Sequence, residues 1–434
     1  MKLVLFSGLF SAFLASAQLT GPVGPLTALS QKTHECNILD YGAVKDNSTD
    51  TADAIEKTFK TCVLPNTGSR LFIPDGQYLI KRSVVLSNGT NWALQLDGLI
   101  TLAYGGNWTV DPIDKGLAVD FEFYSQNGKG AIQGQGYIYR NLANPKFHIV
   151  FDFAENLEVY HLTIRGANLG SYDGVDVVGT NYWIHDIEVT NRDECVSVKS
   201  PSNHALIENL VCNQAGSGIS IGSLNVSASI ANIHARNINI IQGNNIAFIK
   251  TYPGGSGYVT NITFENFRSK ASLYGLDVNQ YWQNTFEPDT GAVALCNLVF
   301  KNFSGSVADG SKRPPLFLVA NDLSFATNVT VEDFSIWTES GTSVVNKISN
   351  IFGHGDNSYG EANGIKSLSS GQAATAYTSS YTVTATPTGW TTPSLPTWAA
   401  ASTGYGTDVP IPVYTPAALW KPSGDYDKHY WGSF

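Results

Sequence analysis

Short apolar runs broken by glycine and asparagine dominate the chain from Leu71 onward. Between residues 157 and 340 these runs share a motif in which one asparagine, aspartate or histidine stands among apolar residues. The copies are VYHLTI at 159–164, IHDIEV at 184–189, IENLVC at 207–212, ARNINI at 235–240, FENF at 264–267, FKNF at 300–303 and VEDFSI at 331–336. They recur about every 23 to 36 residues, a solenoid period. No long helical pattern separates them, which argues against βαβ units. The sequence predicts an all-β, single-domain right-handed parallel β-helix.

One helix is expected ahead of the strands, over Asp50–Thr61, with Asp50 or Thr51 as its cap. The residues on its apolar face are Ala52, Ile55, Phe59 and Cys62. Such a helix would close the exposed first coil, because the terminal units of a solenoid need a cap. The alternative is an ordinary surface helix.

Both ends of the chain depart from the repeat. Residues 1–17 are predicted to be a secretory signal peptide, with Lys2 as its charged head and small residues before the cleavage point. Its apolar run is too short to span a bilayer. Residues 18–366 are assigned to the β-helix. Residues 367–434, rich in Ser, Thr, Pro and aromatic residues, are a wrapped cap or a mobile glycosylated extension, and their aromatic residues favour partial packing.

Charge and sequons indicate an exported protein. The net charge of −10 argues against nucleic acid or an acidic membrane as partner, and we expect a secreted, extracellular monomer. Seven Asn-x-Ser/Thr sequons are candidate glycosylation sites. They are Asn47, Asn88, Asn107, Asn225, Asn261, Asn302 and Asn328.

Five cysteines would enter an oxidising compartment, where most of them should pair. The expected disulfides are Cys36–Cys62 and Cys195–Cys212, which leaves Cys296 free. No CxxC or histidine-rich spacing indicates a metal site, so we expect no metal and no cofactor.

Acidic residues recur at positions 152, 173 and 193–194, about 20 residues apart. In a coiled parallel sheet the rungs lie about 4.8 Å apart, so Asp152, Asp173, Asp193 and Glu194 would stack on neighbouring coils. Carboxylates separated by roughly 5–10 Å are the arrangement that hydrolyses glycosidic bonds.

Strand parity adds further candidates to the outer face. Ala247 and Ile249 should point inward, so that Phe248, Lys250 and Tyr252 point outward together. The same alternation turns Asp152 and Asp176 outward. Carboxylates, a lysine and aromatic rings on one face are typical of a sugar-binding cleft. The alternatives are solvated turn acids, a surface lysine and a phenylalanine that packs between coils.

This arrangement predicts an inverting glycosidase. One protonated carboxyl donates to the leaving oxygen, and one carboxylate activates water. Crowding of the carboxyls should raise the pKa of at least one of them. Asp193 is the predicted acid, and Asp173 and Glu194 orient or deprotonate the water.

Four blocks of this region match a known family. They are Ser171-Tyr172-Asp173-Gly174, Asp193-Glu194-Cys195, Gly216-Ser217-Gly218 and Phe248-Ile249-Lys250. Together with LTGPVGPLT, CNILDYGAV, TNRDECVSVKSP and SIWTESG, they make the chain resemble glycoside hydrolase family 28 from about residue 18 to 341. That family comprises pectin-degrading right-handed β-helices that invert at the anomeric carbon. Its polygalacturonases carry Asn-Thr-Asp-Gly, Asp-Asp-Cys, Gly-His-Gly and Arg-Ile-Lys at these blocks. The Asp-Glu-Cys variant resembles the rhamnogalacturonan hydrolase branch.

The resemblance implies a substrate and places Asp152 and Asp176 in its cleft. Ser217 and Phe248 replace a histidine and an arginine that hold an acidic sugar, so a neutral rhamnose beside the cleaved bond would suit this chain. Lys250 is retained and would pair with a galacturonate carboxylate. The implied activity is endo-hydrolysis of α-D-galacturonosyl-(1,2)-L-rhamnose bonds in plant cell-wall pectic polysaccharide.

Two departures from the family stand out. The connection between GQGYIYR and HIVFDF is shorter by about one coil, which would alter the outer face next to Asp152. A family cysteine pair near VANDLSFATN is absent, so Cys296 lacks an obvious partner.

Three other activities stay open at this point. An exo-acting relative would need a loop that blocks one end of the cleft. A pectin lyase would need calcium and a basic residue, and no calcium cluster is evident. A non-catalytic β-helix would bind cell-wall glycan without turnover.

Overall fold

The computed structural model describes residues 19–107, 119–133, 147–165, 173–284, 290–308, 314–339, 344–355, 364–369 and 371–383. The predicted signal peptide, Ser171, Tyr172 and the tail beyond residue 383 lie outside the described residues. Among the described residues, none of the helices is long and apolar enough to be a membrane span.

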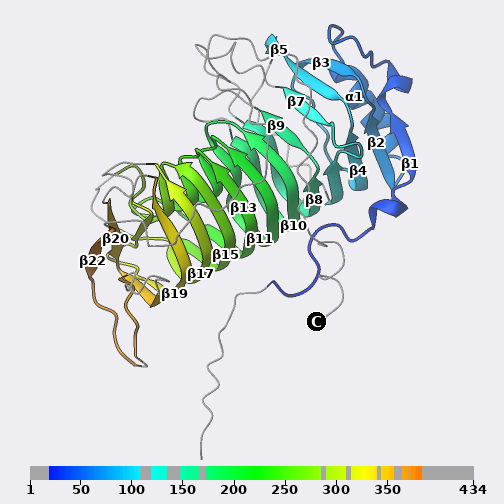
Figure 1. Cartoon of the computed structure of the whole chain (residues 1–434). Coiled ribbons are helices and arrows are strands. Elements are labelled where there is room, and N and C mark those ends of the chain that lie inside the picture. The colour runs from blue at the N-terminus through cyan, green and yellow to red at the C-terminus, as the bar shows by residue number, and fades with distance from the viewer. Residues whose placement is uncertain are drawn as a thin grey trace, which may run out of the picture.

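The chain winds into a parallel β-helix, as predicted, and its strands stack side by side from the blue end to the orange end in Figure 1. The first strands are β1 (His34–Asn37), β2 (Ser69–Ile73), β3 (Gln77–Arg82), β4 (Thr90–Leu96), β5 (Leu99–Asn107), β6 (Val119–Tyr124) and β7 (Ala131–Gln133). The middle strands are β8 (Phe147–Tyr160), β9 (Thr163–Arg165), β10 (Asp173–Thr190), β11 (Glu194–Asn213), β12 (Ser217–Leu224), β13 (Ala228–Ile241), β14 (Asn245–Thr251) and β15 (Gly257–Ser272). The last strands are β16 (Tyr274–Asn279), β17 (Ala294–Val307), β18 (Leu316–Val319), β19 (Ala326–Thr338), β20 (Val344–Ser349), β21 (Ile351–Gly355) and β22 (Thr378–Val383).

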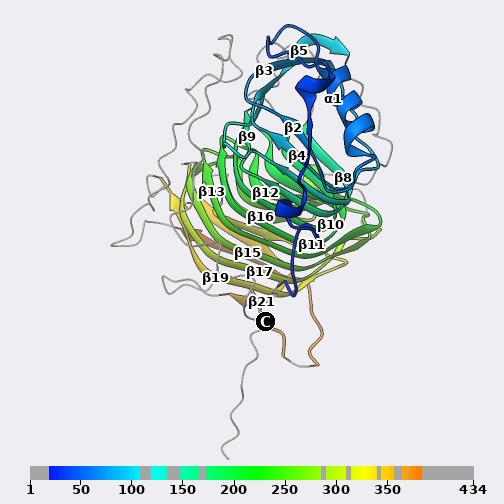
Figure 2. The same ribbon diagram turned by 90° about the vertical axis from the view of Figure 1, so that its right-hand side faces the viewer.

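Seen along the stack, the strands wrap around a common interior (Figure 2). One face is built from β8, β10, β11, β12, β14, β16, β18 and β20, which pair in that order. We call the outer side of this sheet the acid face. The long strands β10 and β11 bend from this face into the next one, because each also pairs along its second half. The strand β22 is antiparallel to β20, so part of the predicted tail packs against the last coils.

The polar residue of each repeated motif marks a bend. All seven of these residues have a positive φ, from 51° to 59°. They are His161, Asp186, Asn209, Asn237, Asn266, Asn302 and Asp333. Asparagine, aspartate and histidine tolerate the left-handed region better than other residues with a Cβ, so the repeat encodes its own turns.

Asparagine side chains also bond from coil to coil. In one ladder the Nδ2 atoms of Asn261 and Asn328 donate to Asn232 and Asn297, and in a second ladder Asn302 donates to Asn266. Such ladders satisfy amide groups along the stack. Three of the seven sequons therefore lie in ladders, whereas Asn225 lies on an exposed loop. The side chain of Asn107 is outside the described residues, and glycosylation of the sequons stays a prediction.

The interior holds apolar side chains stacked in register. Phe267 lies 4.8 Å from Phe303, measured between ring centroids, and Phe303 lies 5.6 Å from Phe334. Offset aromatic pairs of this kind stabilise successive coils.

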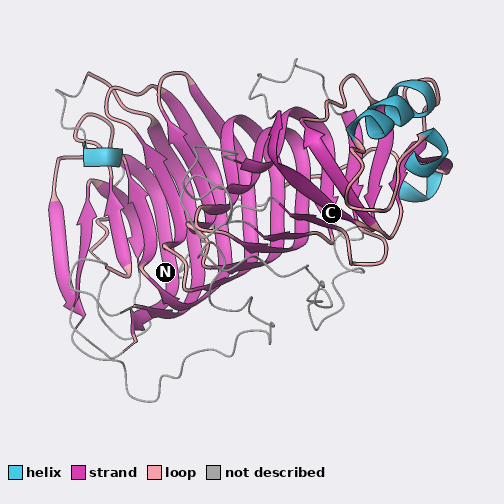
Figure 3. Ribbon diagram, turned by 90° about the horizontal axis from the view of Figure 1, so that it is seen from above, coloured by secondary structure: helices cyan, strands magenta, loops and turns pink. Residues whose placement is uncertain are grey.

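A short helix closes the first coil (Figure 3). Helix α1 (Ala52–Thr58) continues into the π-helical turn η3 (Phe59–Val63), so the helical stretch begins and ends about two residues later than predicted. The carboxylate of Asp50 accepts the backbone N–H of Ala52, while Thr51 makes no side-chain cap bond. All four residues of the predicted apolar face are buried. The remaining short helices are η1 (Leu29–Gln31), η2 (Ile38–Tyr41) and η4 (Trp282–Asn284).

Both expected disulfides are present. Cys36 pairs with Cys62 across the cap, and Cys195 pairs with Cys212 beneath the acidic residues. Cys296 is free and half-buried, and its thiol lies 3.1 Å from the hydroxyl of Thr260.

The coils that precede β10 are less well filled. A cavity of about 300 Å³ is lined by Ile73, Val84, Trp92, Phe121 and Phe151 among others. In the described residues the 147–151 part of β8 pairs only with β10, and its Val150 is 43% exposed. The sheet of the acid face therefore begins at β8 in the described residues, and the connection that is expected to be short lies outside them.

Candidate active site

Three carboxyl groups meet at the start of β10 and β11. Asp173, Asp193 and Glu194 each place a carboxylate oxygen within 4.8 Å of the other two. Val175 pairs with Val196, so Asp173 and Glu194 occupy equivalent positions two residues earlier on adjacent strands. The predicted stacking of Asp173 with Asp193 and Glu194 is thus observed, although Asp173 precedes the other two by 20 and 21 residues.

Position at a corner of the coil decides where these acids point. Strict alternation would turn Asp173 inward with Val175 and Val177, but Asp173 is the first residue of its strand. Its Oδ2 lies 3.7 Å from the Nζ atom of Lys199, and the same ammonium lies 3.8 Å from Oδ2 of Asp176. Asp173 therefore belongs to the acid face and not to the apolar interior. Asp176 is on the outer side, as parity predicted.

Two lysines hold the acids from either side. The Lys250 ammonium forms a close ion pair with Oε1 of Glu194 and is buried. Lys199 is half-buried and also donates to the carbonyl oxygen of Gly222, at 3.2 Å. Lys199 is not among the residues predicted from the sequence, although it follows Val196 and Val198 and parity turns it outward.

The environment separates the pKa values of the carboxyls. Burial, with the nearby Glu194 and Asp176 charges, raises the pKa of Asp173 from 3.8 to about 9. Burial opposes ionisation of Glu194 as well, but a hydrogen bond with Asp193 and the Lys250 ammonium outweigh it and lower the pKa to about 2. Burial also raises the pKa of Asp176, against the opposing charge of Lys199. The cluster thus holds a proton on one side and a fixed negative charge on the other.

Lys250 and Phe248 differ from their predicted roles. Lys250 was expected to pair with a substrate carboxylate, but its ammonium reaches back to Glu194. Phe248 was expected to offer a ring to rhamnose, but it is 3% exposed because it packs edge-on against Trp282, 4.9 Å away. Trp282 is half-buried, and its ring lies 5.2 Å from the Lys250 ammonium.

The remaining predicted residues divide into two groups. Ser217 is in register with Glu194 and fully buried, and its hydroxyl has no hydrogen-bond partner among the described residues. Tyr252 follows β14 and is half-buried. Asp152 is misplaced by the 20-residue spacing: Asp173 pairs with Phe147 and Asp176 with Val150. Asp152 instead lines the cavity, because β8 and β10 pair with an offset of 26 residues (173 − 147) rather than 20.

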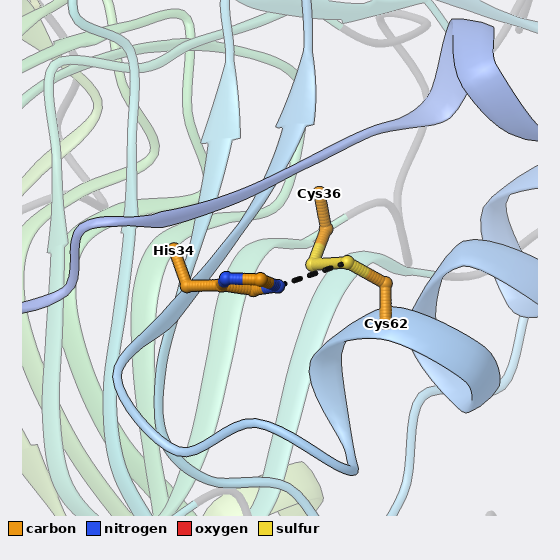
Figure 4. Close-up of side chains that lie close together, drawn as sticks. All are labelled: His34, Cys36 and Cys62. Atoms are coloured by element: carbon orange, nitrogen blue, oxygen red, sulfur yellow. Dashed lines mark hydrogen bonds between the residues drawn. A yellow bond between two sulfur atoms is a disulfide. The ribbon is translucent and has the colours of Figure 1, made fainter.

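Within the described part of the chain, two groups of side chains have the proximity that a metal ion needs. One is the acid triad itself, where the ammonium of Lys250 already neutralises Glu194. The other is His34 with Cys36 and Cys62, shown in Figure 4. There both sulfurs are bound in the disulfide, and His34 Nε2 lies 3.6 Å from Cys62 Sγ, so no thiolate is present to bind a metal.

Buried carboxyls that separate into a protonated and an ionised member are the equipment of a glycoside hydrolase. The family model described as "Glycosyl hydrolases family 28" matches residues 140–355. Probable rhamnogalacturonase A of Aspergillus niger is 38% identical over 94% of this chain and 94% of its own length. The chain belongs to glycosyl hydrolase family 28. Rhamnogalacturonase A of Aspergillus aculeatus is likewise 38% identical, over 92% of this chain and 93% of its own.

Solved structures agree on the fold. The endo-xylogalacturonan hydrolase of Aspergillus tubingensis has a TM-score of 0.56 at 21% identity, covering 79% of this chain and all of that one. The polygalacturonase of Erwinia carotovora ssp. carotovora has a TM-score of 0.52 at 13% identity, covering 78% of this chain and 99% of its own. The expected family and architecture are thereby confirmed, and the chain is a glycoside hydrolase.

Proposed function

We propose that this family 28 enzyme is a secreted endo-hydrolase of α-D-galacturonosyl-(1,2)-L-rhamnose bonds in the rhamnogalacturonan backbone of pectin. The observation that carries the proposal is the triad Asp173, Asp193 and Glu194, whose members are crowded yet differently charged. The 38% identity to proteins named rhamnogalacturonase supports the substrate. Export is supported by the predicted signal peptide and by the two disulfides.

The roles of the three acids follow from their surroundings. Asp193 is the least buried of the three, so it is the group that can approach the leaving oxygen. The proton that crowding retains in the triad belongs to the coupled set rather than to one residue, and Asp193 delivers it. Glu194, kept ionised by Lys250, deprotonates the attacking water, and Asp173, which stays protonated, orients that water.

The family resemblance implies inversion of configuration, and the spacing of the acids constrains how that occurs. Inverting enzymes usually separate their two carboxyls by about 6.5–9.5 Å, and retaining ones by about 5–5.5 Å. The three carboxylates here approach within 4.8 Å. Inversion still requires the water to attack the anomeric carbon from the side opposite the leaving oxygen, so a triad this close must reach both sides of that carbon. Proton NMR of the first-formed product decides this: an inverted anomer supports the scheme, and a retained anomer would overturn it.

The substrate proposal has its own physical support. The Lys250 charge is already paired with Glu194, and Ser217 and Phe248 bring no charge. A neutral sugar beside the cleaved bond needs no further cation. The acid face also continues past the triad on both sides, through β8 and through β12, β14 and β16, which supports cleavage inside a chain.

The test compares two polymers. Purified protein is incubated with rhamnogalacturonan and, separately, with polygalacturonate, and the products are sized by gel filtration. A rapid fall in the molecular mass of rhamnogalacturonan alone is expected. Cleavage of polygalacturonate alone refutes the substrate, release of single sugars refutes the endo mode, and binding without turnover refutes catalysis.

A further inference from the structure

A buried acid that the proposed mechanism does not use lies further along the acid face. Asp277 of β16 is in register with Phe248, which continues the row of Asp176, Ser197 and Ser220 on preceding strands. Like the other members of that row, its side chain alternates with interior residues, since Leu276 and Val278 on either side are buried in the core. Asp277 therefore stands on the same face as the triad, three strands further on.

One of the two oxygens of the Asp277 carboxyl has no hydrogen-bond partner among the described residues. Asp277 is 7% exposed, and its Oδ2 accepts a hydrogen bond from Nδ2 of Asn245, at 3.2 Å. Its Oδ1 is buried without a hydrogen-bond partner among the described residues. A buried polar atom left unpaired is costly and calls for an explanation, for which a bound ligand is one natural choice.

Asp277 is not the only residue of the described acid face with an unpaired buried polar atom. Among the described residues, Oδ1 of Asp176 in the same row also lacks a hydrogen-bond partner. Asp176 and Asp277 are 5% and 7% exposed, whereas Ser220 between them is fully buried, so the two carboxyls are the polar groups of this row nearest the surface. They lie on strands β10 and β16, and a sugar chain laid across the strands is long enough to contact both, which a single small ion is not.

Charge decides which form of Asp277 is present. Burial raises its pKa to about 8, against smaller opposing effects of the Asn245 hydrogen bond and the Lys250 ammonium. Lys250 is committed to Glu194. On the far side Asp277 is in register with Phe317, and the Lys347 ammonium lies beyond, 5.8 Å from that ring. Below pH 8 the carboxyl is therefore neutral, with Oδ2 accepting from Asn245 and the proton on Oδ1.

We propose that Asp277 is a substrate-binding residue that donates a hydrogen bond from its protonated Oδ1 to an oxygen of the uronate-containing chain beyond the cleaved bond. This rests on the proposed function, because it assumes that the polysaccharide lies along the acid face. A neutral donor can bind a sugar hydroxyl or, more strongly, a carboxylate, and it repels neither. An ionised Asp277 would instead repel a polyanionic substrate and could no longer donate. Substrate binding should thus weaken as Asp277 ionises.

The test uses binding, so that it does not depend on turnover. Affinity for a rhamnogalacturonan oligosaccharide is measured by calorimetry between pH 5 and 9.5 in an Asp193→Asn background, with and without Asp277→Asn. Asparagine keeps the shape, the neutral charge and a donor. We expect similar Kd values at pH 5, and at pH 9.5 a weakening that is roughly tenfold or more greater for the background protein than for the asparagine form, because about one decade of binding is lost per pH unit above the pKa of Asp277, while the ionisation of Asp173 affects both proteins alike.

A second variant separates binding from structure. Asp277→Val, with unchanged Kd at pH 5 relative to the background, would overturn the proposal, as would identical pH profiles for the aspartate and asparagine forms. A Kd raised at pH 5 by Asp277→Val, with the melting temperature retained and little or no increase at pH 9.5, supports it. Hydrolysis by the wild type is scored separately: no turnover with pH-dependent binding refutes the proposed catalysis and leaves the assignment of Asp277 intact.

Discussion

The coils before β10 and those from β10 to β16 share a repeat but differ in how they use buried acids. In the first region Asp97 accepts four hydrogen bonds, from the Gln95 amide, the Ser125 hydroxyl and the backbone N–H groups of Gln126 and Asn127. In the second region Asp173 is surrounded by other carboxyls, and burial raises its pKa. The first arrangement stabilises a turn, whereas the second lowers the stability of the fold and leaves carboxyls that can react. Buried acids alone therefore do not mark an active site; their partners do.

The two regions also differ in packing. The cavity of about 300 Å³ lies among the early coils, and Asp152 lines it. In the later coils the interior residues Val175, Val177, Val196 and Val198 are fully buried. A site that needs carboxyls placed to within fractions of an ångström gains from a close-packed support, because packed side chains hold rotamers in place. The triad lies where that support is complete.

The largest expected effect is a difference in kcat between variants of one acid from each region, Asp193 and Asp152. Asp193→Asn should lower kcat on rhamnogalacturonan about 10³-fold, because it removes the proposed proton donor. Asp152→Asn should stay within about threefold of the wild type, because it touches only the cavity. Reducing-sugar release measures both. Equal losses of kcat in the two variants would contradict the distinction between the two regions.

A smaller loss is expected when the cation is removed from the triad. Lys250→Met should reduce kcat/KM about 10- to 100-fold, since Glu194 would remain buried without its ion pair and its pKa would rise. The acid limb of the pH–rate profile should accordingly move to higher pH. Lys347→Met, on the same face but over Phe317, is the matched control, and a comparable shift there would contradict the role given to Lys250.

One added methylene group should have opposite effects on the free energy of unfolding in the two regions. Val84→Leu projects into the cavity and should leave the free energy of unfolding unchanged or raise it by up to about 1 kcal/mol. Val196→Leu, in the filled interior, should cost about 1–3 kcal/mol by overpacking. Urea unfolding measures the two. If Val196→Leu were tolerated as well as Val84→Leu, the contrast in packing would be wrong.

The smallest expected effects concern how the stability of variants of the two buried aspartates, Asp173 and Asp97, depends on pH. Because the folded-state pKa of Asp173, about 9, lies above its ordinary 3.8, the folded protein keeps a proton that the unfolded chain releases. Its contribution to stability therefore falls as pH rises between these values. Asp173→Asn escapes this loss, so its melting temperature should match the wild type near pH 4 and exceed it by about 1–3 °C near pH 8.

Asp97→Asn should behave in the opposite way. An amide cannot accept all four of the hydrogen bonds that the carboxylate accepts, so the variant should lose about 1–3 kcal/mol at neutral pH. Calorimetry of both variants at the two pH values checks the pair. A stabilised Asp97→Asn, or an Asp173→Asn that is destabilised at pH 8, would show that the hydrogen-bond partners do not explain the difference.

Local pattern in the sequence was enough for the coils, the bends and the two disulfides. The apolar alternation, the left-handed residues from His161 to Asp333 and the capped helix are properties of a few neighbouring residues, and sequence reports such properties directly. Parity likewise turned Asp176 outward correctly.

Only the tertiary structure decided what meets across coils. The spacing of acids suggested Asp152, but β8 and β10 pair with an offset of 26 residues (176 − 150), so Val150 lies next to Asp176. The direction of Lys250, the covering of Phe248 by Trp282 and the half-paired Asp277 were equally invisible. Register between coils depends on the lengths of the connections, and a long side chain can span several strands. The few residues around a motif specify neither the register between coils nor the reach of a side chain across strands. The sequence therefore identified the acids, while the fold determined their partners.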